Sequence, residues 1–211
     1  MADVIPAILA KSYEELERMV RTVEPYVERV HLDIMDGVFV SNTTITGYDE
    51  LIRLDTNLKF DVHLMVENPA DLMYHWYEVR GKADTFLVHA ERANGLRELL
   101  EQIRLNQCRA GLVLNPETAV EEVQELLELI DMMQFMTVHP GFYGGQFIDD
   151  VLGKITDFRE SHPDRPILVD GGITPETAIK TLRAGATTLV SGSYIFNSPD
   201  PAKAILELKN I

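Results

Sequence analysis

The sequence is poor in cysteine and has no long apolar stretch. Its 211 residues contain one cysteine, Cys108, so no internal disulfide can form and no second thiolate is present for a zinc site. No run approaches the ~18 consecutive apolar residues that a membrane span needs, and the first residues lack the cationic segment of a secretion signal. We therefore expect a cytoplasmic protein that has no membrane partner.

Basic residues are also scarce. Lysine and arginine total 19 against 34 aspartates and glutamates, which gives a formal net charge of -15. Binding to a nucleic-acid backbone needs clustered lysine and arginine, so this balance argues against nucleic acid as a partner. The overall field would likewise oppose a phosphate ester, and such a ligand would have to be held locally by backbone N–H groups of glycine loops.

The chain lacks Ser/Gly linkers and low-complexity tracts, so we expect one domain that spans residues 1–211. Short apolar, β-branched runs alternate with charged amphipathic segments, and the runs cover residues 4–9, 30–35, 60–65, 85–89, 110–114, 135–138, 167–170 and 188–191. Such alternation predicts parallel strands joined by right-handed crossovers. Eight units favour an α/β fold with a single closed (β/α)8 TIM barrel, and the periodicity leaves a doubly wound open sheet as the alternative.

Local signals mark where several helices begin. Ser12 followed three residues later by Glu15 has the pattern of a capping box, and Thr174 followed by Pro175 predicts a cap and a first-turn proline. Residues 115–117 are predicted to open another helix, whose apolar stripe contains Val120, Val123, Leu127 and Ile130.

The residues that end the apolar runs are the candidates for chemistry, because the active sites of such barrels lie at the carboxyl ends of the strands. The polar and sulfur-containing residues found there are His31, Asp33 and Met35 on one face of the second run, His63 and Met65 in the third, His89 in the fourth and Asp170 in the seventh.

Two imidazoles and two carboxylates can converge on one divalent ion, and a mixed nitrogen and oxygen set suits Zn²⁺, Fe²⁺, Mn²⁺ or Co²⁺. The candidates are His31, His63, Asp33 and Asp170. Asp33 lies within the apolar run VHLDIM, where a buried charge needs a partner or a metal. Spacing alone leaves two interpretations open, a metal site or a set of hydrogen-bonded histidines and turn-capping aspartates.

A site of this kind suits proton transfer next to a carbonyl group. A metal beside a carbonyl acts as a Lewis acid, and a nearby carboxylate can take the proton from the adjacent carbon. With carboxylates on both sides of the substrate plane, one removes a proton and the other returns a proton to the opposite face. The outcome is an epimerisation.

Glycines cluster after the last three runs, where barrels commonly bind phosphate through loop amides. They are Gly141, Gly144 and Gly145 after the sixth run, Gly171 and Gly172 after the seventh, and Gly192 with Ser193 after the eighth. Turn chemistry would explain any one cluster, but three on successive strands favour a phosphate site.

Other residues carry less information. Spacing alone assigns Met35, Met65 and Met136 to the core. His75 and His162 lie in helix or loop patterns and are expected at the surface, whereas His139 stays unassigned.

The segments VHLDIMDGVFVSN, FDVHLMVENP, MTVHPGFYGGQF, ILVDGGIT and LVSGSYIF resemble, in order and spacing, the signature blocks of ribulose-phosphate 3-epimerases. The likeness spans nearly the whole chain. It implies a barrel of the ribulose-phosphate-binding type and an isomerase of the pentose phosphate pathway that forms a homo-oligomer. The substrate implied is a small sugar phosphate.

The resemblance also implies roles for individual residues. The matching positions for one bound divalent metal ion are His31, Asp33, His63 and Asp170, and the two aspartates among them would be the acid/base pair. Met35, Met65 and Met136 would line the substrate cavity together with His63. The phosphate would rest on the glycine loops at 141–145, 171–172 and 192–193.

Four departures from the family pattern bear on the choice of substrate. Ala7 stands where the family commonly has a serine with a substrate-facing hydroxyl, and Val38 and Ser41 replace a histidine and a proline of the family's loop. Tyr143 occupies the first glycine of a glycine pair. All four positions that match the family's metal ligands are retained, which favours retained catalysis.

We therefore expect reversible C3 epimerisation of a ketose phosphate, D-ribulose 5-phosphate to D-xylulose 5-phosphate, through an enediolate. D-allulose 6-phosphate is the alternative substrate, and a non-catalytic sugar-phosphate-binding barrel is the alternative of another class. A decarboxylase of the phosphate-binding barrels ranks below these, because by resemblance it carries an Asp-x-Lys pair and the third residue here is Met35.

Overall fold

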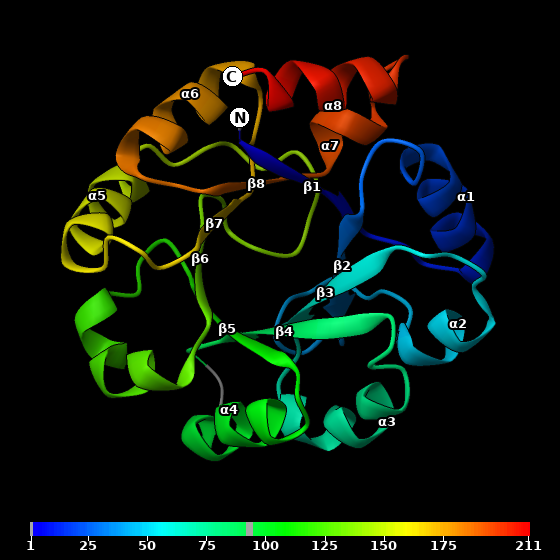
Figure 1. Cartoon of the computed structure of the whole chain (residues 1–211), viewed down its shortest axis with the longest axis horizontal. Helices are drawn as coiled ribbons and strands as arrows, with labels where there is room; N and C mark the ends of the chain where they lie inside the picture. The colour runs from blue at the N-terminus through cyan, green and yellow to red at the C-terminus, as the bar shows by residue number, and fades with distance from the viewer. Residues whose placement is uncertain (1, 92–94) are drawn as a thin grey trace.

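The strands close into one parallel barrel in the order β1-β2-β3-β4-β5-β6-β7-β8, and helices surround it (Figure 1). The computed structural model describes residues 2–91 and 95–211. The strands are β1 Asp3–Ile8, β2 Arg29–Met35, β3 Lys59–Met65, β4 Ala83–His89, β5 Arg109–Leu114, β6 Met132–Met136, β7 Ile167–Asp170 and β8 Thr188–Ser191. The predicted barrel is confirmed and the open sheet is wrong.

The helices lie between successive strands and after the last one. The α-helices are α1 Tyr13–Val23, α2 Tyr48–Arg53, α3 Met73–Glu78, α4 Leu96–Leu105, α5 Val151–Ser161, α6 Pro175–Ala184, α7 Ser193–Phe196 and α8 Pro201–Lys209, and the 3₁₀-helices are η1 Pro69–Leu72 and η2 Val120–Leu129. The predicted caps hold, because the Ser12 hydroxyl accepts from the backbone N–H of Glu15 and the Thr174 hydroxyl from that of Thr177. Among the described residues, no helix is long and apolar enough to cross a bilayer.

The helix predicted to begin at residues 115–117 is wrong in both its start and its type. The helix there starts only at Val120 and is a 3₁₀-helix. The preceding residues form a loop, because the Lys154 ammonium donates to the carbonyls of Asn115, Pro116 and Thr118 and so holds their backbone out of a helix.

Six strands begin or end away from their predicted positions. Four of them, β2 to β5, begin one or two residues earlier than predicted and end where predicted. The first covers Asp3–Ile8 in place of 4–9, and the sixth covers Met132–Met136 in place of 135–138. The sixth was misjudged because Gln134 interrupts its apolar run, although the side chain is fully buried. Its amide donates to the Asp170 carboxylate, with Nε2 3.2 Å from Oδ2, which satisfies a polar group inside the barrel.

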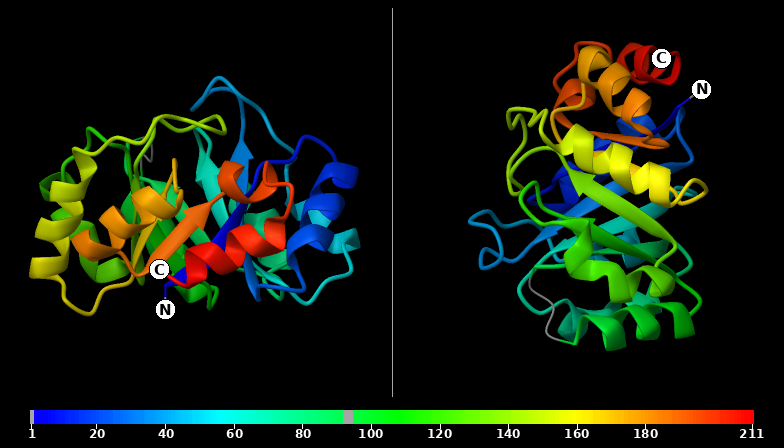
Figure 2. Two further views of the ribbon diagram at one scale, coloured as in Figure 1. Left: turned by 90° about the horizontal axis from the view of Figure 1, so that it is seen from above. Right: turned by 90° about the vertical axis from the view of Figure 1, so that its left-hand side faces the viewer.

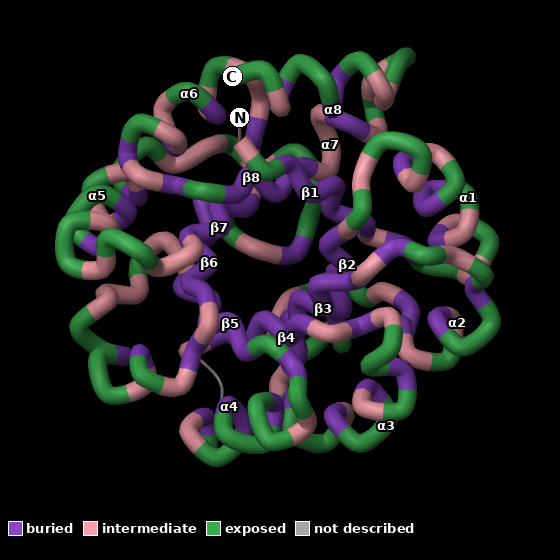
Figure 3. The backbone as a smooth tube through the Cα atoms, viewed as in Figure 1, coloured by how far each residue is buried: buried purple, intermediate pink, exposed green. Residues whose placement is uncertain are grey.

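Apolar side chains fill two concentric regions. The larger one lies between the strands and the helices, and Figure 3 shows the strands buried while the helices are exposed on their outer sides. A smaller cluster fills the barrel interior and consists of Ala7, Leu87, Val113, Met132, Met136, Val138, Leu168 and Val190. Buried polar side chains, among them His31, His63 and Gln134, also lie in the interior, a departure from the usual apolar filling that marks a functional region.

Two long loops cover the carboxyl ends of the strands, while both chain termini lie at the other end of the barrel (Figure 2). These loops connect β2 to α2 and β6 to α5. They touch, because the Asn42 side-chain amide donates to the carbonyl of Gly141, with Nδ2 2.9 Å from the oxygen. These two loops therefore partly cover the mouth of the barrel.

Candidate active site

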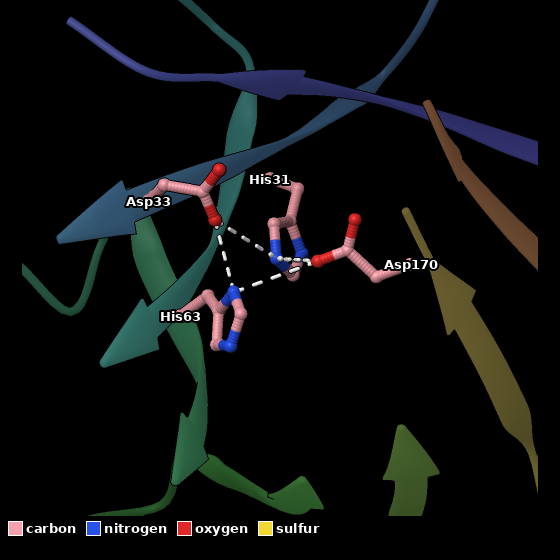
Figure 4. A group of neighbouring side chains, drawn as sticks. All are labelled: His31, Asp33, His63 and Asp170. Carbon is pink, nitrogen blue, oxygen red and sulfur yellow. Dashed lines mark hydrogen bonds and ion pairs between the residues drawn. The ribbon is translucent and has the colours of Figure 1, made fainter. Parts of the chain in front are cut away.

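Strand register brings the predicted metal ligands together at the mouth of the barrel. Asp33 on β2 pairs with His63 on β3, and one level deeper His31 pairs with Asp61. Because side chains alternate along a strand, His31 and Asp33 both point into the barrel. Asp170, at the end of β7, faces them across the interior (Figure 4).

The four side chains present one atom each to a common point. His63 Nδ1 lies 2.9 Å from Asp33 Oδ1 and 3.6 Å from Asp170 Oδ2. His31 Nε2 lies 3.6 Å from each of the same two oxygens. All four candidate ligand atoms fall within 4.8 Å of one another. Figure 4 shows the carboxylates on either side of the two imidazoles.

This geometry fits a divalent ion. Ligand atoms about 2.0–2.2 Å from one tetrahedral ion lie roughly 3.4 Å from each other, close to the 2.9 and 3.6 Å observed. Within the described part of the chain, neither ring nitrogen of the buried His31 has a hydrogen-bond partner. A buried polar atom without a partner is costly, and a metal bond would satisfy Nε2.

Burial keeps His31 neutral and makes the carboxylates hard to ionise together. Burial, helped by His63, holds the pKa of His31 well below its usual value. Burial and repulsion by Asp33 raise the pKa of Asp170 to about 7, and His63 opposes this only in part. Neutral imidazole is the form that binds metal, and two adjacent carboxylates need a cation between them.

A small cavity opens over this cluster, with a volume of about 40 Å³. The predicted site residues that line it are Asp33, Met35, His63, Met65, Met136, Gly141, Gly144, Gly145, Asp170, Gly171, Gly172, Gly192 and Ser193. His31 lies beneath them and is fully buried. No lysine or arginine is among the described residues that line the cavity. The three methionines therefore lie at the site, whereas spacing alone assigned them to the core.

Tyr143 occupies much of the mouth. Its hydroxyl donates to the Ala7 carbonyl at 2.5 Å and accepts from the Leu9 backbone N–H at 2.8 Å. Its ring lies against Gly192, where a Cβ atom would be only 2.4 Å from the ring. The Tyr143 hydroxyl is therefore engaged with the backbone beside Ala7.

The other departures and histidines lie away from the cavity lining. Val38 and Ser41 are exposed on the loop after β2. His75 is exposed as predicted, whereas His162 is only half-exposed because its ring stacks on Phe158. His139 is exposed and lies 3.5 Å from a Glu117 carboxylate oxygen.

Two neighbours of the cluster had no role predicted from the sequence: His89, which was only a strand-end candidate, and Glu91, which was not a candidate. His89 Nε2 lies 2.9 Å from His63 Nε2, and His89 Nδ1 lies 3.2 Å from Glu91 Oε2. Burial lowers the pKa of His89 to about 4, against the influence of Glu91, so its ring is neutral near pH 7. The available signal was a histidine at the end of a strand with a glutamate two residues later.

Comparisons with known proteins agree with this geometry. The model of the ribulose-phosphate 3 epimerase family matches residues 3–196. The ribulose-phosphate 3-epimerase of Bacillus subtilis is 37% identical, covering 99% of both chains. The chloroplastic ribulose-5-phosphate-3-epimerase of Arabidopsis thaliana is 36% identical over 98% of this chain and 75% of its own.

Solved structures share the fold at lower sequence identity. A 3-hexulose-6-phosphate synthase superposes with a TM-score of 0.72 and 17% identity, covering 100% of this chain and 99% of its own. An orotidine 5'-monophosphate decarboxylase from Sulfolobus solfataricus superposes with a TM-score of 0.63 and 18% identity. The match covers 100% of this chain and 97% of the decarboxylase. These likenesses concern the barrel alone.

Proposed function

This chain belongs to the ribulose-phosphate 3-epimerase family and is an epimerase, and from that premise we propose that it interconverts D-ribulose 5-phosphate and D-xylulose 5-phosphate with one divalent ion bound. The observation that carries the proposal is the convergence of His31, His63 and two aspartates, within 4.8 Å, at the floor of a cavity ringed by glycine loops. A divalent ion there supplies Lewis-acid polarisation of the substrate carbonyl.

Asp33 and Asp170 move the proton. They come from β2 and β7 and face each other across the cluster (Figure 4). One carboxylate takes the proton from C3, which leaves an enediolate across C2 and C3. The other delivers a proton to C3 from the opposite face, and the configuration is inverted. The reverse reaction exchanges the two roles.

Methionines and glycines would hold the substrate around this centre. Met35, Met65 and Met136 line the cavity and keep water from the reacting carbon while offering no proton. The backbone amides of the loops at 141–145, 171–172 and 192–193 would hold the phosphate, since no lysine or arginine is among the described residues of the lining.

Tyr143 bears on which sugar phosphate is accepted. A cavity of about 40 Å³ is far below the roughly 300–1,000 Å³ of ordinary ligand pockets, so a ketose phosphate needs the Tyr143 loop to move. Release of the ring from Gly192 would widen the place where the phosphate loops meet. A hexulose phosphate is one carbon longer, and we therefore favour the pentulose over D-allulose 6-phosphate.

The experiment is an assay of the purified protein on ribulose 5-phosphate, allulose 6-phosphate and unphosphorylated ribulose, with and without chelator. We expect the highest kcat/KM for ribulose 5-phosphate, and loss of activity on chelation that added metal restores. Binding of the phosphate group, remote from C3, should make the free sugar a far poorer substrate.

Two results would contradict the proposal. Equal efficiency on ribulose and its 5-phosphate would remove the phosphate site, and the variant Tyr143→Gly would then show whether the tyrosine had closed it. No turnover of any ketose phosphate by metal-loaded protein would favour a non-catalytic sugar-phosphate-binding role.

A further inference from the structure

A row of three buried or half-buried side chains leads away from the metal cluster. His63 turns Nδ1 toward the two carboxylates and Nε2 toward His89. His89 in turn directs Nδ1 to the Glu91 carboxylate, with 3.2 Å between Nδ1 and Oε2. The Phe39 ring covers His89, with the two ring centroids 4.6 Å apart. The row connects the end of β3 to the loop after β4.

Glu91 is fixed as an acceptor at the outer end of this row. Its other oxygen, Oε1, accepts from the backbone N–H of Asn115 at 2.8 Å and from the hydroxyl of Thr118 at 2.5 Å. An ionised carboxylate has no proton to donate. The hydrogen bond to Glu91 therefore requires the proton of the neutral His89 ring to lie on Nδ1.

The position of the His89 proton determines the direction of the hydrogen bond between His89 and His63. A neutral imidazole has one donor and one acceptor nitrogen, so a proton on His89 Nδ1 leaves Nε2 as an acceptor. His63 Nε2, 2.9 Å away, must then donate. The opposite direction, with His89 Nε2 donating to His63 Nε2, would leave the lone pair of His89 Nδ1 against the Glu91 carboxylate.

We propose that Glu91 is a positioning residue that acts through His89 to fix the tautomer of His63, so that the Nδ1 lone pair of His63 is the one offered to the bound cation. The proposal rests on the metal site of the proposed function. It assigns Glu91 and His89 no contact with the substrate.

At the inner end of the row, this assignment requires a bound cation. A lone pair on His63 Nδ1 points at Asp33 Oδ1, only 2.9 Å away, and repels it. A cation held by both atoms turns this repulsion into attraction. Metal binding and the hydrogen bonds of the row therefore support each other, and because such coupling is reciprocal, loss of Glu91 weakens the metal site.

The first measurement is zinc affinity, by competition with a chromogenic chelator, for the wild type, Glu91→Ala, Glu91→Gln and Thr118→Val. Removing a side chain that orients a metal ligand typically weakens metal binding about 10- to 100-fold, and we expect this loss for Glu91→Ala. Glu91→Gln keeps an oxygen acceptor for His89 and should recover most of the affinity. Thr118→Val is the matched control, since it removes a contact of Glu91 Oε1 and leaves Oε2 with His89.

The second measurement is ¹⁵N NMR of the histidine rings, in metal-free and zinc-loaded protein, with a His89→Gln spectrum for assignment. We expect the His89 proton on Nδ1 in the wild type and a mixture of tautomers in Glu91→Ala. A purely structural role for Glu91 would leave the His89 tautomer unchanged.

Two outcomes would overturn the proposal. One is a His89 proton on Nε2 in the wild type, and the other is zinc affinity in Glu91→Ala equal to that of the wild type. Failure of the proposed function has a different signature, because a zinc-loaded wild type with the expected His89 tautomer and no epimerase activity would leave this assignment standing. A wild type that binds no zinc would contradict both.

Discussion

The two ends of the barrel both bury carboxylates, but they neutralise them by different means. At the amino end, Asp61 on β3 is 2% exposed and lies 2.6 Å from the Arg29 guanidinium, which also contacts Asp84 at 2.7 Å. At the carboxyl end, Asp33 and Asp170 share a cavity whose described lining residues include no lysine or arginine. The amino end supplies its own cation, whereas at the carboxyl end the divalent ion of the proposed function would supply the positive charge.

This difference separates a structural charge cluster from a functional one. Two charged groups can be buried only when they are paired or bound to a metal. In the proposed reaction a cation must polarise the substrate carbonyl. An arginine that is ion-paired with two carboxylates would not be available for that role. The fold keeps the internal ion pair at the end where the termini lie and keeps the open cluster under the loops (Figure 2).

The largest expected effect is on activity. Asp33→Asn and Asp170→Asn should each reduce turnover at least ~10²-fold, because an asparagine cannot take the C3 proton as a base. Asp61→Asn is the matched variant at the amino end, and it should keep most of the activity at temperatures where it is folded. Steady-state assays of metal-loaded proteins test this contrast.

Proton exchange in heavy water distinguishes loss of a base from loss of the metal. With metal content checked first, a variant that lacks one carboxylate should fail to exchange C3 of one epimer, or exchange it without inversion, and the other variant should show the complementary defect. Normal exchange with inversion in both would mean that neither aspartate moves the proton.

Much of the carboxyl-end cluster follows from local rules. Strand periodicity puts His31 and Asp33 on one face, and the parallel register then sets His63 beside Asp33. The ends of barrel strands are where active-site residues lie. These rules need only strand periodicity and parallel register. The four candidate ligand atoms lie within 4.8 Å of one another and the predicted glycines line one cavity, while the roles of these residues stay predictions.

The other features of the site and of the fold depend on contacts between segments that are distant in sequence. The Tyr143 hydroxyl reaches the backbone of Ala7, 136 positions away, and no local pattern specifies that loop path. Gln134 hides the start of β6 because the partner of its buried amide nitrogen, Asp170, lies on another strand. The Glu91 contact with His89 likewise depends on how the loop after β4 turns back.

The second-largest expected effect is on the stability of the protein, and it concerns only the amino end of the barrel. Arg29→Met leaves Asp61 buried without its guanidinium, and loss of one partner of a buried pair costs about 3 kcal/mol. The double variant Arg29→Met/Asp61→Leu removes both charges and should recover most of that loss. Urea unfolding at pH 7 measures the free energies, and metal analysis should find the ion content unchanged. A double variant no more stable than Arg29→Met would mean that packing, not charge, accounts for the loss.

The smallest expected effect is a pH dependence of the stability lost in Arg29→Met. Burial raises the pKa of Asp61 even though Arg29, Thr85 and Arg109 oppose it, and removing Arg29 raises the pKa further. The folded variant then holds a proton that the unfolded chain, with a carboxyl pKa of about 3.9, releases. Its unfolding free energy therefore increases as the pH falls from the raised folded pKa toward about 4.

The stability deficit of Arg29→Met relative to the wild type should accordingly be greatest at pH 7 and shrink as the pH falls toward about 4. The double variant lacks the titrating carboxyl, so its difference from Arg29→Met isolates Asp61 and cancels the acid sensitivity of the metal site, which all three proteins share. Asp84 also loses its contact with Arg29, but it does so in both variants, so the difference between them cancels its contribution. If the deficit is constant between pH 4 and 7, the buried charge of Asp61 is not its source, and the contrast between the two ends of the barrel would have to rest on geometry alone.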